Sequence, residues 1–395
     1  MKKIYLDYAS STPLDPEVFE EMLPYFANKT GNASSVHRFG QELKVVIEEC
    51  RESIAHTINA ESAEIVFVSG GTESDNFALK GMMKFLRAKN KTHVITSSIE
   101  HQAVLETCDY LSNNDFQISH LIPEKDGTIS VASVQNLIRN ETGMISLMHV
   151  NNELGTINPI EEIGAIAAKN NILFHTDAVQ SFGKIPIDVK KINIDLLSAS
   201  AHKIYGPKGI GILYIRNGTE IESLIHGGGQ ERGRRAGTES VPLIKGFASA
   251  LQKIVHNSPL EFSRNNFLKK ILIAKLSENF SSSASGISFT INGNLENAIP
   301  NILNISFVSP DFEIDGEMVL LNLDLEGIAV SSGSACTSGS LKPSHVLLAL
   351  GCDEKTANAS IRFSFGRRTT EEEIDYTAKT LFEIVKRIAH KIKKA

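Results

Sequence analysis

Short apolar segments alternate with amphipathic segments from about residue 60 to residue 255, and this alternation restricts the fold more than any other feature of the chain. Apolar segments with the length of β-strands lie at 64–69, 93–97, 117–122, 144–150, 172–175, 195–198 and 211–215. Helical patterns fill several of the gaps, at 73–88, 102–112 and 161–168. Strands that alternate with helices predict a mostly parallel, seven-stranded sheet covered by helices on both faces.

The pattern changes after Val241. Helices are expected at about 241–256 and 264–279, followed by strands at 287–291 and 302–307. Near the C-terminus, Thr370 and Glu373 have the spacing of a capping box, and apolar residues then recur at helical spacing up to Ile392. We therefore expect an α/β protein with a large domain of residues 16–257 and a smaller α+β domain made of 1–15 and 258–395.

The composition excludes several classes of protein. Hydrophobic residues make up 42% of the 395 residues, which is enough for a large core and too many for a disordered chain. A net charge of −6 does not favour binding to nucleic acid. The sequence has no apolar run of ~18 residues for a membrane-spanning helix, and its start lacks the apolar segment of a secretory signal. We expect a cytoplasmic protein that contacts neither nucleic acid nor membrane.

One of the four cysteines has an unusual setting. Cys50 and Cys108 share helical spacing with apolar residues, which predicts burial, and Cys352 follows a helical segment. No C-x-x-C pair is present, so neither a disulfide framework nor a zinc site is expected. Cys336 lies among the small and polar residues of 331–340, which predicts an exposed, flexible loop. Its thiol is either a harmless loop thiol or a nucleophile that a nearby cation or base activates.

Polar residues follow the predicted strands directly, at the sheet edge where α/β proteins bind ligands. After the strand at 64–69 come Gly70, Gly71 and Thr72, and then a helix. Two glycines, a hydroxyl and the N–H groups of a helix N-terminus can bind a phosphate, although a tight strand-to-helix turn has the same sequence.

Asp177 and Gln180 follow another predicted strand, at 172–175. An acid and an amide there suit a heteroaromatic ligand with a basic ring nitrogen, although a helix cap at Asp177 is the alternative. His101 and Asn152 come at the ends of two further strands, where a histidine alone is more often structural than catalytic.

A lysine completes this set of polar residues. Lys203 lies next to His202 and close to Ser200, directly before a Gly/Pro turn, and a lysine in such a site can form a Schiff base with a carbonyl cofactor. Pyridoxal 5'-phosphate needs a Schiff-base lysine, a partner for its ring nitrogen and a phosphate cradle. The combination therefore predicts a pyridoxal-phosphate site.

Several longer segments match one family in order along the chain. They are 5–7, 70–76, 100–101, 148–153, 177–181, 200–211, 226–238, 331–338 and 360–364. On these segments the chain resembles the cysteine desulfurases of the NifS/IscS type, within the class V group of fold-type I pyridoxal-phosphate enzymes. The resemblance implies the fold-type I transferase fold and pyridoxal 5'-phosphate as the cofactor.

The resemblance also implies roles for residues around the cofactor ring. Lys203 is expected to form the Schiff base, and Asp177 to face the pyridinium nitrogen. Gln180 would bind the phenolic oxygen, and His101 would stack on the ring and move protons. Asn152 would contact both cofactor and substrate.

For the phosphate, the resemblance implies Gly71, Thr72, Ser200 and His202, joined by Thr238 from the other subunit of a homodimer. Arg362 would bind the substrate carboxylate through its planar guanidinium, together with Asn152. Cys336 would attack the substrate sulfur. No intrinsic metal is expected, although Cys336 could ligate a nascent iron–sulfur cluster transiently.

The function that follows from the resemblance is removal of sulfur from L-cysteine, which gives L-alanine and a persulfide on Cys336. An iron–sulfur scaffold protein or another acceptor, such as the machinery of tRNA thiolation, would take the sulfur. Three alternatives stay open. These are a selenocysteine lyase, an aminotransferase or other class V enzyme without use for Cys336, and a catalytically idle subunit that serves as a docking platform.

Overall fold

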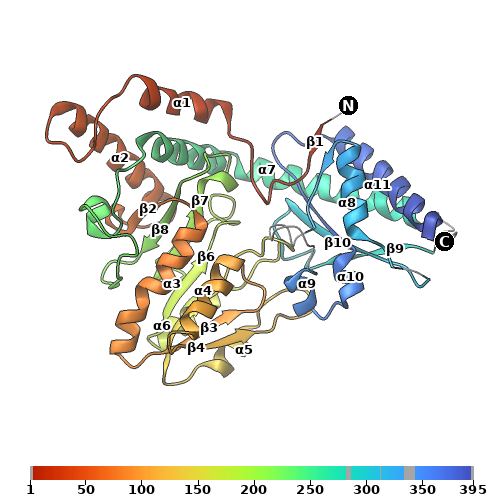
Figure 1. Ribbon diagram of the computed structural model, residues 1–395, viewed down its shortest axis with the longest axis horizontal. Coiled ribbons are helices and arrows are strands. Elements are labelled where there is room, and N and C mark those ends of the chain that lie inside the picture. Colours follow the sequence, from red (N-terminus) through yellow and green to blue (C-terminus); the bar gives the residue numbers. More distant parts are fainter. Residues whose placement is uncertain (1–2, 282–285, 312, 333–342, 393–395) are drawn as a thin grey trace.

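The computed structural model describes residues 3–281, 286–311, 313–332 and 343–392, and its largest sheet has seven strands (Figure 1). Their spatial order is β2 (Ile65–Val68), β8 (Gly211–Ile215), β7 (Leu196–Ser200), β6 (Leu173–Asp177), β5 (Thr142–Ser146), β3 (His93–Ser97) and β4 (Gln117–Leu121). Neighbouring strands are parallel except that β8 runs antiparallel to both β2 and β7. The predicted mostly parallel sheet is confirmed.

Both faces of this sheet are buried, because successive strand residues point to opposite sides. Val66 and Val94 face a core that contains the apolar sides of α3 (Gly71–Ala88) and α4 (Gln102–Ser112). Phe67 and Ile95, their neighbours in the chain, face a larger core on the other side. The helices that contribute to that core include α1 (Pro16–Ala27), α2 (Arg38–Thr57), α5 (Val131–Leu137) and α6 (Ile160–Lys169).

Helix α7 differs from the sequence prediction. The two helices expected at 241–256 and 264–279 form one continuous helix, Val241–Ser281, although Pro259 lies inside it. A proline removes one N–H and leaves the carbonyl four residues earlier without its usual partner. Here the hydroxyl of Ser258 donates to the carbonyl of Val255 at 3.0 Å, which satisfies that oxygen. The prediction of a break was therefore wrong.

A second core lies around a smaller antiparallel sheet, at the right of Figure 1. Strand β10 (Ile302–Val308) pairs with β9 (Ser288–Asn292) and with β12 (Ser360–Ser364). The N-terminal β1 (Ile4–Tyr5) pairs in parallel with β11 (Ile328–Ala329). Helices α8 (Gly316–Leu325) and α11 (Glu371–Ile392) pack on this core, while the short α9 (His345–Ala349) and α10 (Glu354–Asn358) lie between the two cores.

Helix α11 begins with the capping box that the sequence predicts. The Thr370 N–H donates to the Glu373 carboxylate at 3.0 Å, and the Glu373 N–H donates to the Thr370 hydroxyl at 3.3 Å. Helix α7 joins the two cores, since Ile254 packs in the larger core and Leu268 in the smaller one. The expected boundary between residues 257 and 258 falls inside this helix and stays a prediction.

Candidate active site

Four of the predicted site residues lie at one edge of the large sheet, where the carboxyl ends of β3, β6 and β7 meet. Asp177 and Ser200 are the last residues of β6 and β7, and Lys203 ends the 3₁₀ turn that follows β7. His101 is the N-cap of α4, just beyond β3. Because these strands run parallel and adjacent or nearly so, the fold brings together residues that are far apart in sequence.

Lys203 points toward the N-terminal segment of the chain. Its Nζ donates to the carbonyl oxygens of Ala9 and Ser10, both at 2.7 Å. Burial lowers the pKa of Lys203 to about 7, and the positive charges of Arg362 and Lys184 act in the same direction. A lysine with such a pKa is a competent amine nucleophile and proton carrier near neutrality.

Asp177 is buried and accepts a hydrogen bond from the N–H of Val179 at 2.8 Å. Burial raises its pKa, while the positive charges of His101 and Lys203 oppose that shift. Asp75, on α3, is also buried, and both burial and the charge of Asp177 raise its pKa well above the usual range. The sequence analysis quoted Asp75 within a matching segment but gave it no role.

His101 has a defined ring orientation. Its Nδ1 accepts a hydrogen bond from the N–H of Ala103 at 3.1 Å, which assigns the proton of the neutral ring to Nε2. Desolvation lowers the pKa of His101, and the charge of Asp177 acts in the opposite direction. His101 is therefore neutral near pH 7 and able to accept or share a proton.

The predicted phosphate cradle lies between β2 and α3. Helix α3 begins at Gly71, so its first N–H groups have no partner inside the helix. A Cβ on Gly71 would come within 2.8 Å of a methyl group of Val179, and one on Gly70 would lie 3.9 Å from the Ser200 hydroxyl. Thr72 is exposed in the first turn of the helix. Backbone atoms and small side chains therefore line the predicted phosphate cradle.

His202 lies beside this cradle and contacts the N-terminal segment. Its Nδ1 lies 3.2 Å from the Ser11 hydroxyl, and its carbonyl accepts from the N–H of Thr12 at 2.9 Å. Burial lowers the pKa of His202 to about 4, so the ring is neutral and can donate through one nitrogen only.

Arg362, on β12 of the smaller sheet, reaches into the same region. Its Nη1 donates to the carbonyl of Asn152 at 2.9 Å, and its Nη2 donates to Asp7 at 2.9 Å and to the Ser10 hydroxyl at 2.7 Å. Its Nε is buried with no hydrogen-bond partner among the described residues. The sequence analysis missed the contribution of Asp7, which its position after a short predicted strand could have suggested.

Two predicted residues are not joined to this set. Thr238 is exposed, and nearby Arg235 instead pairs with Glu73 at 2.9 Å. Cys336 lies outside the described residues.

Among the residues that are described, no group of three His, Cys, Asp or Glu side chains could hold a metal ion. Nor do the described segments include a helix long and apolar enough to cross a membrane.

The residues present fit pyridoxal 5'-phosphate. The Gln180 side chain donates to the Ala9 carbonyl at 2.9 Å, while its Oε1 is buried and has no partner among the described residues. The unpartnered Gln180 oxygen can accept from the hydroxyl of the cofactor, and the buried Asp177 carboxyl can face its ring nitrogen. The Lys203 amine suits the aldehyde, and the N–H groups at the start of α3 suit the phosphate.

The fold and the site together define a fold-type I pyridoxal-phosphate enzyme. The family model described as "Aminotransferase class-V" matches residues 4–377, and the chain belongs to that family, whose members include the NifS/IscS-type enzymes and use pyridoxal 5'-phosphate. The resemblance stated from the sequence is therefore confirmed.

Named relatives and solved structures agree with this assignment. The chain is 46% identical over 387 residues to "Cysteine desulfurase IscS" of Dictyoglomus turgidum, covering 98% of this chain and 95% of that one. It is 43% identical to "Putative cysteine desulfurase IscS 1" of Bacillus subtilis, with coverage of 98% and 100%. A solved "NIFS-LIKE PROTEIN" matches with a TM-score of 0.88 at 38% identity, covering 97% and 99% of the two chains. The solved "SspA in complex with cysteine" matches with a TM-score of 0.79 at 40% identity, covering 92% and 99%.

Proposed function

We propose that this protein is a cysteine desulfurase that converts L-cysteine to L-alanine and carries the sulfur away as a persulfide of Cys336. The observation that carries the proposal is the convergence of the Lys203 amine, the Asp177 carboxyl and the Arg362 guanidinium at one site. Relatives at 43–46% identity named cysteine desulfurase support the choice of reaction and substrate.

Arg362 and Asn152 are proposed to bind the substrate carboxylate. The Arg362 Nε has no hydrogen-bond partner among the residues that the structure describes, and its Nη2 is shared between Asp7 and Ser10. A carboxylate can complete these hydrogen bonds in a bidentate manner. This binding places the substrate amino group on the Lys203 side of the site.

Lys203 and His101 are proposed to move protons during the reaction. With a pKa of about 7, Lys203 can gain and release a proton near neutrality. The Nε2 of His101 is free to exchange a second proton, because Nδ1 is already engaged with Ala103. Pyridoxal phosphate, when bound, supplies an electron sink for the substrate carbon, and the Asp177 carboxylate would hold a proton on its ring nitrogen.

Cys336 supplies the nucleophile in this proposal. Its thiolate attacks the substrate sulfur, so that an S–S bond forms while the bond between that sulfur and the substrate Cβ breaks. The electron pair of the broken bond stays with the substrate, which is protonated to alanine. The persulfide sulfur is then passed to an iron–sulfur scaffold protein or to another acceptor. A reducing cytoplasm suits this chemistry, because Cys336 has to return to a free thiol.

The homodimer is part of the proposal through Thr238. Thr238 is exposed, in a segment that Arg235 fixes beside the start of α3 through its ion pair with Glu73. We propose that Thr238 serves a second subunit, because its hydroxyl suits a phosphate-binding role in the partner's site.

The experiment is to purify the protein with its yellow cofactor, add L-cysteine and a reductant, and assay sulfide and alanine together. Equal amounts of both products are expected. Cys336→Ser should keep the cofactor's absorbance and lose sulfur transfer, whereas Cys352→Ser is the matched control that should retain it. Yellow protein that releases no sulfide, or a Cys336→Ser variant with unchanged turnover, would contradict the proposal. Parallel assays with a keto acid and with selenocysteine test the aminotransferase and selenocysteine lyase alternatives.

A further inference from the structure

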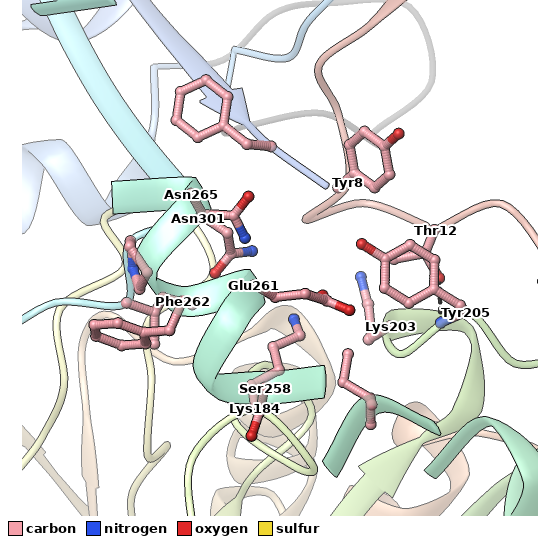
Figure 2. Close-up of a pocket in the computed structure, with 14 residues that line it drawn as sticks. Tyr8, Thr12, Lys184, Lys203, Tyr205, Ser258, Glu261, Phe262, Asn265 and Asn301 are labelled. Carbon is pink, nitrogen blue, oxygen red and sulfur yellow. Dashed lines mark hydrogen bonds between the residues drawn. The ribbon is translucent and has the colours of Figure 1, made fainter. Parts of the chain in front are cut away.

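A second cavity lies beside Lys203, and Asp177 is not among the residues that line it. It lies between α7, the start of β10 and the segment before β7 (Figure 2). Of the residues predicted for the active site, Lys203 alone is among those that line it. Its walls include Ile254, Phe262 and Phe365, so much of the surface is apolar.

Two largely buried amides line this cavity. Asn265 on α7 and Asn301 before β10 are 7% and 8% exposed, respectively. Neither side chain forms a hydrogen bond with any described residue, and Figure 2 shows both amides directed toward the space in front of Glu261 and Lys203. An amide that faces a cavity and forms no hydrogen bond with protein is unfavourable unless a ligand or water contacts it, so such a contact is expected here.

A cation faces the same space. The ammonium of Lys184 has no ion pair within 4 Å and no hydrogen bond among the described residues. Burial lowers the pKa of Lys184 to about 8, and the negative charge of Glu261 opposes this shift. The neighbouring Glu261 carboxylate is bound through its Oε1 by the guanidinium of Arg367, and its negative charge acts on Lys184 from beyond ion-pair distance.

We propose that this cavity is a binding site for a small monocarboxylate with a compact apolar body. Lys184 would pair with the carboxylate, the amides of Asn265 and Asn301 would donate to its oxygens, and the apolar wall of Ile254, Phe262 and Phe365 would cover the rest. The site goes beyond the desulfurase reaction and does not depend on it, because it requires neither Cys336 nor the cofactor.

The test is binding of isobutyrate and of its neutral isostere isobutyramide to the holoenzyme, measured by ligand-observed NMR. Isobutyrate is expected to bind at least about tenfold more tightly than isobutyramide, since only the acid pairs with Lys184. Lys184→Met should remove this preference. Asn265→Leu, which replaces an amide with an apolar side chain of similar volume, should also weaken isobutyrate binding. This variant tests the proposal if Lys184→Met does not fold.

The competing carboxylate site at Arg362 is controlled with Arg362→Gln, which should leave isobutyrate binding unchanged. Binding that is lost in Arg362→Gln and kept in Lys184→Met would place the probe in the substrate site and overturn the proposal. Equal binding of acid and amide would show that Lys184 selects no carboxylate, and no binding of either would show that the two asparagines hold water only. Each result would overturn the proposal. None of these readouts requires turnover, so failure of the proposed desulfurase reaction would be seen separately.

Discussion

The guanidinium Nη2 of Arg362 donates a 2.9 Å hydrogen bond to the carboxylate of Asp7, across 355 residues of sequence. Asp7 lies shortly after β1, next to Leu6 of the smaller core, and Arg362 lies on the central part of β12. The ion pair fixes the plane of the guanidinium while its Nε stays unpaired. A preorganised, partly unsatisfied arginine is a suitable binding group for a carboxylate.

Arg362→Lys should therefore raise the KM for cysteine more than it lowers kcat. A lysine keeps the charge but loses the planar fork that contacts Asn152, Asp7 and the substrate together. Loss of one charge-assisted hydrogen bond of about 1.5–3 kcal/mol corresponds to an increase in KM of about 10- to 100-fold. Initial rates over a range of cysteine concentrations measure both constants. An unchanged KM would show that Arg362 does not bind the substrate carboxylate.

Gly211 controls how closely β8 approaches the phosphate cradle. A Cβ on Gly211 would lie 2.6 Å from the carbonyl of Ala199 and 2.8 Å from the Cα of Gly70, both of which are backbone atoms that cannot turn aside. Gly211→Ala should destabilise the protein by about 1–3 kcal/mol and, by displacing Gly70, weaken retention of pyridoxal phosphate. The measurements are the unfolding free energy and the dissociation constant of the cofactor.

The matched control for this change is Gly229→Ala, because a Cβ there meets nothing within 4 Å. Gly229→Ala should leave cofactor affinity unchanged. If Gly211→Ala bound the cofactor as tightly as the wild type, the cradle would not depend on the close approach of β8 to Gly70.

Periodicity and turn residues were sufficient to predict the large sheet and the positions of Asp177, Ser200 and Lys203, because strand ends in an α/β sheet meet at one edge. They failed at α7, where Pro259 signals a break that the hydroxyl of Ser258 compensates by binding the Val255 carbonyl. Hydrophobic periodicity does not show whether a side chain will accept the role of hydrogen-bond donor to a backbone carbonyl, so the continuous helix could not be predicted.

The site residues that sequence analysis missed contribute through contacts between distant segments. Asp7, Lys184 and Asn301 lie in separate connecting segments. Only the position of Asp7, after a short predicted strand, could have suggested a role. Packing of α7 against the start of β10 creates the second cavity, so its polar residues were not recognisable before the fold was known. The roles of Cys336 and Thr238 stay predictions from the sequence.

Asp75 is expected to be protonated, and Asp75→Asn should therefore be tolerated. Its Oδ1 lies 3.6 Å from Nε2 of His175, yet burial raises the pKa of Asp75 well above the usual range and lowers that of His175 to about 3, so both groups are neutral. In the wild type, the contribution of Asp75 to stability falls as pH rises above about 4, because the unfolded carboxyl ionises freely while the native one retains its proton.

Since Asp75→Asn removes this penalty, its stability relative to the wild type should increase between pH 5 and pH 8. Urea unfolding of the apoproteins at the two pH values measures the difference. Asp75→Ala is the control, because it leaves a cavity and should be destabilised at both pH values. A relative stability of Asp75→Asn that falls with rising pH would show that Asp75 is ionised in the native protein.

Lys203 should give the apoprotein a pH dependence of the opposite sign. Its pKa is lowered from the ordinary lysine value to about 7, so between pH 7 and about 10 the unfolded state binds more protons than the native state. Stability attributable to this residue therefore rises with pH over that window, by at most about 1.4 kcal/mol per pH unit. Lys203→Met lacks the titrating group, so its stability advantage over the wild type should shrink steadily from pH 7 to pH 9.5. Urea unfolding of both apoproteins across this range tests the prediction, with the exposed Lys208→Met as the control that should follow the wild type. A constant difference between Lys203→Met and the wild type would mean that Lys203 stays protonated in the native site and cannot act as a neutral amine near pH 7.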